Sequence, residues 1–261
     1  MFLLVAKGDD HLRFLYGLIL SFLFVTIAFV LNWITLDGAA SSLLFGTIAL
    51  GFGGWVGAAV TLAFFVSSSL VSKSIDLSEQ DASKKIPFRR NAVQVWANGF
   101  WFAFWVLIWF LSQKPMFMIA AISSMAFATA DTWGSEIGGH RVRGTTWLLK
   151  GFKKVQPGVD GGVSLMGTLA SIAGAVFITL VFWVMSPENH WGIYLTVVLA
   201  GFLGSFLDSW IGATLQGKRL HRFVRSMFAN KILIVDNNLT NWLSAGSASI
   251  TALFIILFTG L

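Results

Sequence analysis

The chain has 261 residues, of which 56% are hydrophobic and 11% charged, and its formal net charge is +6. An ordinary soluble domain carries about a quarter charged residues, so the composition excludes that class and predicts a polytopic membrane protein. Apolar runs of about twenty residues recur, each long enough to cross a hydrocarbon layer of about 30 Å as a helix. We therefore expect an all-α transmembrane bundle in which residues 1–261 form a single integral domain.

The predicted helices begin with a span at residues 15–34. The uncharged run 38–71 is too long, at about 1.5 Å per residue, for one straight crossing, and must be broken. Glycines at 51, 53, 54 and 57 mark the expected break, and the spacing of Gly53 and Gly57 favours close helix packing over a nucleotide loop. The remaining spans are predicted at 92–111, 116–133, 163–185, 192–214 and from 239 to the end.

The basic residues gather in three long loops and at the N-terminus, whereas the short turns near Asp37, Lys114 and Glu188 hold one base between them. Such a distribution sets orientation in membrane proteins, so we interpret the positive charge as a topology signal and expect no nucleic-acid partner. The long loops are predicted to face the cytoplasm, in a prokaryotic plasma membrane. A cytoplasmic N-terminus requires about seven crossings with one broken helix, and eight remain possible if the N-terminus lies outside.

The chain also contains an internal repeat of helix pairs, at residues 89–133 and 153–210. Each pair ends in an aspartate, a hydroxyl residue and tryptophan, the aspartates being Asp131 and Asp208. The last span resembles the first half of a third copy. Since both aspartates close helices that run towards the cytoplasm, we expect them to meet at one membrane face.

Acids at these positions favour a bound cation. A carboxylate at a helix C-terminus faces the negative end of the helix dipole, and burying an ionised acid beside lipid costs several kcal/mol. Cysteine is absent, so any metal would be held by oxygen or imidazole ligands. Asp131, Asp208 and Glu136 are therefore candidate metal ligands, with ion pairs to loop bases as the alternative.

Polar pairs four residues apart open the outgoing helices and complement the acids. The pairs are Gln94 with Asn98, Asp160 with Ser164, and Asn237 with Asn241. Helix N-termini offer free N–H groups to phosphate, although amide pairs can equally join helices. Gly161 and Gly162 either let the backbone approach a ligand or form a turn.

The loop bases are candidates for neutralising a polyphosphate, with topology signals or contacts to anionic headgroups as the alternative. They are Lys84, Lys85, Arg89, Arg90, Lys150, Lys153 and Lys154. Oxygen ligands, phosphate-binding helix starts and surrounding lipid together point to metal-assisted phosphoryl transfer to a membrane-borne acceptor.

Five segments carry a family resemblance. They are RNAVQVWANG at 90–99, ATADTWGSEIG at 128–138, VQPGVDGGVSLMGTLASIAGA at 155–175, GSFLDSWIGATLQ at 204–216 and NNLTNWLSA at 237–245. In this order they resemble the integral membrane family that contains plant phytyl phosphate kinase. The match covers about residue 31 to the end, so the family core is expected at about 38–261, with the helix at 15–34 peripheral.

The resemblance implies a kinase that uses CTP or another nucleoside triphosphate to convert a prenyl monophosphate, such as phytyl or geranylgeranyl monophosphate, into the diphosphate. By block, it implies Mg²⁺ on Asp131, Glu136 and Asp208, with Asn98, Asp160 and Asn241 completing the polar site. Phosphate contacts are then expected from Arg90, Lys154, Gly161 and Gly162.

Three alternatives stay open at this point. The first is nucleotidyl transfer from CTP to a lipid phosphate, which releases pyrophosphate. The second is a membrane transporter or flippase that uses the same acidic site, although its acids lie at helix ends and not at the membrane midplane. The third is a non-catalytic membrane scaffold.

Overall fold

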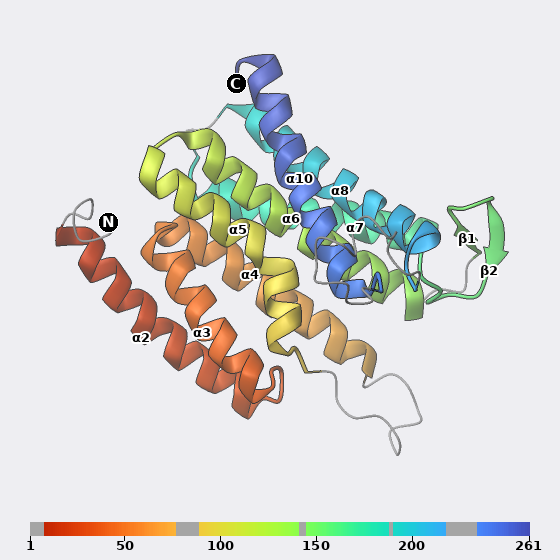
Figure 1. Ribbon diagram of the computed structural model, residues 1–261, viewed down its shortest axis with the longest axis horizontal. Coiled ribbons are helices and arrows are strands. Elements are labelled where there is room, and N and C mark those ends of the chain that lie inside the picture. Colours follow the sequence, from red (N-terminus) through yellow and green to blue (C-terminus); the bar gives the residue numbers. More distant parts are fainter. Residues whose placement is uncertain (1–7, 77–88, 141–144, 188–189, 218–233) are drawn as a thin grey trace.

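The computed structural model describes residues 8–76, 89–140, 145–187, 190–217 and 234–261. These parts of the chain form α-helices and three short strands (Figure 1). The helices are α2 (Gly8–Val30), α3 (Leu36–Gly51), α4 (Gly54–Asp76), α5 (Ala92–Ser112), α6 (Pro115–His140), α7 (Leu165–Met185), α8 (Trp191–Thr214) and α10 (Asn237–Thr259). Seven of them are long and apolar enough to cross a membrane, and α3 is shorter. The predicted all-α membrane bundle is confirmed.

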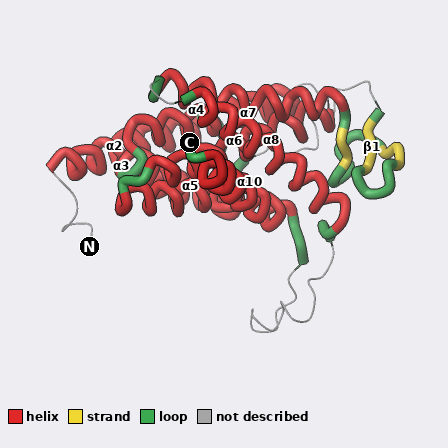
Figure 2. Tube along the Cα trace, turned by 90° about the horizontal axis from the view of Figure 1, so that it is seen from above, coloured by secondary structure: helices red, strands yellow, loops and turns green. Residues whose placement is uncertain are grey.

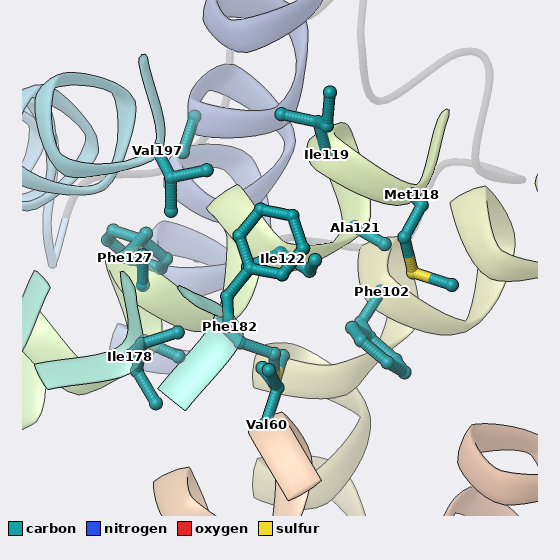
Figure 3. Packing of buried hydrophobic residues seen from close by; sticks show 14 of the residues in the cluster. Val60, Phe102, Met118, Ile119, Ala121, Ile122, Phe127, Ile178, Phe182 and Val197 are labelled. Carbon is teal, nitrogen blue, oxygen red and sulfur yellow. The ribbon is translucent and has the colours of Figure 1, made fainter. Parts of the chain in front are cut away.

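Helix α6 runs through the centre of the bundle and packs against α4, α5, α7, α8 and α10. Side chains from all of these helices form one hydrophobic core around it. Figure 3 shows Ile122 and Phe127 of α6 among Phe102 of α5, Ile178 of α7 and Val197 of α8. Because α6 is enclosed by other helices, the acids near its end lie in the protein interior and not against lipid.

Small residues allow the helices around α6 to approach closely. A Cβ at Gly174 of α7 would lie 2.9 Å from the backbone oxygen of Thr129 on α6, and one at Gly201 of α8 would lie 2.8 Å from Ala126. At Gly204 the same atom would lie 2.9 Å from Ala248 of α10. Side chains larger than hydrogen would hold these helices apart, as expected for small residues at membrane helix contacts.

The predicted break in the long uncharged run falls at Phe52 and Gly53, between α3 and α4. Helix α3 returns along α2, since Gly17 approaches Thr47 and Gly46 approaches Ser21. Helix α4 then runs parallel to α2, and Lys73 Nζ near its end donates to Leu31 O at 2.6 Å. The break is therefore a reversal, and Gly53 and Gly57 both pack against Ala49, as their spacing predicted.

This reversal corrects two details of the predicted topology. The Asp37 turn lies beside the start of α5, where Arg90 N donates to Trp33 O at 3.0 Å, and not with the turn at Lys114. The start of α2 lies at the opposite end of the bundle, since Phe14 and Phe110 both pack on Phe52. The sequence left this second arrangement open, because its few charges near the N-terminus gave only a weak orientation signal.

A three-stranded antiparallel sheet, which the sequence analysis did not predict, precedes α7. It consists of β1 (Thr146–Leu148), β2 (Lys153–Val155) and β3 (Gly162–Val163), in the order β2-β1-β3. Strands of two or three residues carry too little alternation to be recognised in a sequence. Figures 1 and 2 show the sheet at one end of the molecule and α2 and α3 at the other.

Candidate functional site

A polar cavity of about 310 Å³ lies where α6 and α8 end and where α7 and α10 begin. Its wall also includes the loop between β2 and β3. Eight of the residues predicted for the site line it, namely Asp131, Glu136, Asp160, Gly161, Gly162, Ser164, Asp208 and Asn237. As predicted, both aspartates lie at the same face of the bundle as two of the polar helix starts, those of α7 and α10.

Asp131 and Asp208 form the acidic centre of this cavity. Both side chains are half-buried, and Asp208 is close enough to Asp131 and Asp160 for their charges to interact. Asn241 of α10, with its amide nitrogen turned towards Asp208, donates to Asp208 Oδ1 at 3.3 Å and to Asn237 O at 3.1 Å. One side-chain amide thus ties an acid at the end of α8 to the start of α10.

Three hydroxyl residues that the sequence analysis did not predict for the site, Thr168, Ser171 and Ser205, line the cavity together with the predicted Ser164. Ser164, Thr168 and Ser171 occupy the first turns of α7, and Ser171 Oγ lies 3.3 Å from Ser205 Oγ on α8. Their spacing of four and three residues on one helix face was the signal that could have identified them. These hydroxyls give the cavity neutral donors and acceptors around its two central acids.

Glu136 borders the cavity, but its carboxylate has another partner. Ser72 Oγ of α4 donates to Glu136 Oε1 at 2.9 Å, and Glu136 also interacts electrostatically with Arg90. Residues five apart on an α-helix point about 140° apart at 3.6 residues per turn, so Asp131 and Glu136 face different neighbours. Because the sequence analysis expected the helix to end near Trp133, it treated Glu136 as part of a loop, whereas α6 continues to His140.

Within the described residues, no three His, Cys, Asp or Glu side chains are grouped so that they could hold one metal ion. The carboxylates of Asp131 and Asp208 nevertheless suit magnesium. That ion is usually held by one or two carboxylates, with the remaining positions taken by water and substrate phosphate. Binding of Mg²⁺ by Asp131 and Asp208 stays a prediction.

The loop from Gln156 to Gly161 is both a turn and part of the cavity wall. Gly158 and Gly161 have φ of +84° and +74°, which L-residues rarely adopt, and Gly162 N donates to Val159 O at 2.8 Å. A Cβ on Gly161 would overlap the backbone of Ala213 on α8. The loop and the end of α8 are therefore in direct backbone contact, and Asp160 lies in this loop and not, as its pairing with Ser164 suggested, on a helix.

The start of α5 does not line this cavity. Arg90, Gln94 and Asn98, all predicted for the site, line a second, mostly apolar cavity of about 460 Å³ between α2, α3, α4 and α5. Asn98 Nδ2 donates to Gln94 O at 3.0 Å, so the pair faces one way, as predicted. The α2–α3 turn holds the start of α5 here, because Thr35 N donates to Arg90 O at 3.1 Å and Ala92 N to Asp37 Oδ2 at 2.9 Å.

Arg90 is buried, with 6% of its surface exposed. Its Nη1 donates to Ser69 Oγ, and its guanidinium lies over the rings of Phe64 and Phe65 at 5.7 and 5.4 Å from the centroids. Burial lowers the pKa of Arg90 to about 10, and the nearby Glu136 opposes this shift. The guanidinium therefore remains a cation at neutral pH, inside an apolar surrounding.

Lys154, the remaining predicted phosphate contact, is exposed on β2 and does not line either cavity. It pairs across the sheet with Trp147, and its Nζ lies 5.4 Å from the centroid of that ring. Of the other predicted bases, Lys84 and Lys85 lie outside the described residues. The sequence analysis did not predict this pairing of strands, which places Lys154 beside an aromatic ring.

Comparisons with known proteins identify relatives over most of the chain. It is 32% identical over 188 residues to an uncharacterized membrane protein of Methanocaldococcus jannaschii, covering 70% of this chain and 74% of that one. It is 28% identical to Protein PGR of Arabidopsis thaliana, covering 80% and 81% of the two chains. It is 27% identical to Protein VTE6, chloroplastic, of Arabidopsis thaliana, covering 76% of this chain and 61% of that protein.

No solved structure matches the chain. The model of one family, described as integral membrane protein DUF92, matches residues 19–249, which include every element from α3 to α8, most of α2 and the first half of α10. The family resemblance read from the five sequence segments is thereby confirmed. The chain belongs to the DUF92 family of integral membrane proteins.

Proposed function

We propose that this protein is a kinase for prenyl monophosphates such as phytyl or geranylgeranyl monophosphate, and that CTP or another nucleoside triphosphate is the phosphoryl donor. The observation that carries the proposal is the polar cavity, in which Asp131 and Asp208, from the C-terminal halves of two helices, adjoin the starts of α7 and α10. Membership of the family that includes Protein VTE6, chloroplastic, supports an enzyme of this class.

The cavity supplies positioning and charge, which are the main requirements of phosphoryl transfer. In the proposed reaction an oxygen of the prenyl monophosphate forms a bond to the γ-phosphorus, and the bond from that phosphorus to the β–γ bridging oxygen breaks, giving the prenyl diphosphate and a nucleoside diphosphate. The second ionisation of a phosphate monoester has a pKa of about 6, so the attacking oxygen is largely ionised at neutral pH. The proposed transfer therefore needs no general base.

Each part of the cavity has a role in this proposal. When bound, Mg²⁺ would neutralise the phosphate charge, and Asp131 and Asp208 are the residues that would hold it. Asn241 orients Asp208 through its 3.3 Å hydrogen bond. The start of α7, where Gly167 and Thr168 line the cavity, would face the phosphates with the positive end of its dipole.

The cavity is proposed to face the cytoplasm, because a nucleoside triphosphate is too highly charged to arrive through lipid. The ends of α6 and α8 line this cavity, and each precedes a basic segment of the sequence, which the positive-inside rule assigns to the cytoplasm.

The test is transfer of radiolabel from γ-labelled CTP or ATP to geranylgeranyl or phytyl monophosphate by the purified protein in detergent with magnesium. Label is expected in the prenyl diphosphate, with loss of about 10²-fold or more in Asp131→Asn and in Asp208→Asn, since each variant removes a carboxylate that would hold Mg²⁺. Asp10→Asn is the matched control. Asp10 pairs with Arg13 near the start of α2, at the other end of the bundle, so this variant should retain full activity.

Other outcomes would select the rival functions. Release of pyrophosphate in place of a nucleoside diphosphate would replace the kinase by a nucleotidyltransferase. Failure of folded protein to label any acceptor from farnesyl to undecaprenyl monophosphate would reject the kinase and move the assignment to transport through the same acidic site.

A further inference from the structure

The second cavity combines an apolar interior with one buried cation. Its wall is formed mainly by α2, α3, α4 and α5, and its volume of about 460 Å³ lies within the range of sites that enclose one small ligand. Most of its lining is aliphatic or aromatic, including Leu20, Phe24, Phe45, Leu62 and Phe65. Arg90, Gln94 and Asn98 form its polar part.

Arg90 has more donors than the protein uses. A guanidinium offers five N–H groups, and within the described residues the side chain makes one hydrogen bond, from Nη1 to Ser69 Oγ. Arg90 lines the cavity while it packs against Phe64 and Phe65, so its remaining donors are open to a ligand in the cavity. An anionic group with several oxygens, such as a phosphate, matches both its charge and its donor pattern.

The cavity opens on the outer surface of the bundle. Two of its lining residues, Trp55 and Leu62 of α4, are 56% and 46% exposed, and in a membrane-spanning helix such side chains face lipid. A lipid can therefore enter from the bilayer with its chain between α2 and α4. The polar part, at the start of α5, is where its headgroup would lie.

The Arg90 end of this cavity is adjacent to the acidic cavity. Arg90 interacts electrostatically with Glu136, and Glu136 borders the polar cavity that contains Asp131. Ser69 and Ser72, one turn apart on α4, contact Arg90 and Glu136 respectively. A phosphate bound at Arg90 would thus lie next to the wall of the cavity proposed for the nucleotide.

Two other apolar hollows, along α5 and α10, fit a lipid phosphate less well. Neither is lined by lysine or arginine from the described residues. One of them is lined by Asp236, whose negative charge would repel a phosphate. The charge of the lining therefore distinguishes the α2–α5 cavity from these hollows.

We infer that the cavity between α2 and α5 is the acceptor site and binds one isoprenoid monophosphate, with the chain among α2, α3 and α4 and the phosphate on Arg90, Gln94 and Asn98. This inference rests on the proposed kinase function for the identity of the lipid. It also gives α2, which the sequence analysis placed at the periphery of the family core, a direct role in holding substrate.

The test uses photolabelling of the full chain in detergent, without nucleotide. The probe is geranylgeranyl monophosphate with a photoreactive group at the end of its chain, and labelled peptides are mapped by mass spectrometry. Label is expected on α2, α3 or α4, with competition by unmodified geranylgeranyl monophosphate. Label confined to α7, α8 or α10, or equal competition by geranylgeraniol or by a diacyl phosphatidic acid, would overturn the inference.

Two variants sharpen the test. Ala59→Phe places a ring in the cavity and should reduce labelling about tenfold, whereas Leu70→Phe, at an exposed position of the same helix outside the lining, should not. Arg90→Gln should weaken competition by the monophosphate about 10- to 100-fold and leave competition by the alcohol unchanged. Undiminished labelling of folded Ala59→Phe protein would contradict the proposed site.

The outcomes separate this inference from the kinase proposal. Phosphoryl transfer together with label outside the cavity would leave the kinase and reject the acceptor site. Label within the cavity and no transfer from any nucleotide would reject the kinase and retain a binding site for lipid monophosphates. In active protein, Ala59→Phe should raise the KM for the prenyl monophosphate about tenfold and leave the KM for the nucleotide unchanged.

Discussion

Asp208 depends on residues from other parts of the chain. It interacts with Asp131 in the C-terminal half of α6 and with Asp160 in the loop before β3, and it accepts a hydrogen bond from Asn241 of α10. Without a cation, Asp208 would be repelled by each of these two carboxylates, and repulsion is stronger in a protein interior than in water. A divalent ion or the positive ends of α7 and α10 would relieve that repulsion, which is why a phosphate–metal complex suits this position.

Asp37 has the opposite role, as an acid that stabilises a connection in the fold. Its carboxylate accepts hydrogen bonds from Thr35 Oγ1 and from Ala92 N at the start of α5. The bond from Thr35, followed by the bond from Ala92, holds the pKa of Asp37 below its usual value of 3.8. The ionised form therefore joins the α2–α3 turn to α5, beside the Arg90 end of the proposed acceptor site.

The pKa of Asp37 leads to a pH-dependent prediction. Because the folded pKa is lowered, the ionised carboxylate adds stability at neutral pH, and this contribution is lost as the pH falls through that value. Asp37→Asn should lower the Tm in detergent slightly at pH 7, and the difference from the unmodified protein should shrink as the pH falls below the usual pKa of 3.8. A difference in Tm that stays constant between pH 7 and pH 3 would contradict this role.

At the scale of elements, the polar cavity is assembled by backbone contacts between a loop and a helix end. Gly161 packs directly on Ala213 of α8, and Gly212 approaches the backbone of Gly161 in return. The backbones of Gly138 on α6 and Gly167 on α7 also approach each other closely. Glycine at these points brings Asp160 and the start of α7 to the two central acids.

A pair of glycine variants tests this contact. Gly161→Ala would strain a φ of +74° and overlap Ala213, so it should displace the loop and reduce phosphoryl transfer about 10- to 100-fold. Gly151→Ala is the matched control, because its φ is +80° and a Cβ there meets nothing within 4 Å. Both variants carry similar backbone strain, so equal activities would show that the contact with α8 is not needed.

For the whole molecule, the arrangement of α2, α3 and α4 determines which chain segments share a membrane face. The start of α2, the α3–α4 turn and the end of α5 lie together, and the polar cavity lies where α6 and α8 end. Seven of these helices are long and apolar, and the shorter α3 lies between the first two of them, α2 and α4. With this order, the N-terminal end of α2 lies away from the candidate site.

Single cysteines test this arrangement directly, because the chain contains none of its own. In intact cells a membrane-impermeant maleimide should label Leu12→Cys and Lys114→Cys, and should label Phe152→Cys, beside the sheet, only after lysis. All three positions are exposed. Labelling of Leu12→Cys and Lys114→Cys from opposite sides would contradict the fold, whereas reversal of all three would overturn only the cytoplasmic orientation.

Much of the fold follows from the sequence alone. Long uncharged runs must be helical in a membrane, because each backbone N–H and C=O group needs an internal partner there. The repeat of Asp131 and Asp208 at the ends of returning helices was enough to place both acids at one face, and the glycines of the long run were enough to locate its break. These properties depend on local composition and on the alternating direction of successive helices.

Only the tertiary structure decided how the polar residues divide between two cavities. Arg90, Gln94 and Asn98 resemble the other polar helix starts in sequence, yet Asp37 and Thr35 hold them beside an apolar cavity. Glu136 follows Asp131 closely, yet its place on α6 turns it towards Ser72. Such pairings depend on helix rotation and on contacts between distant segments, and spacing along one chain does not determine either of them.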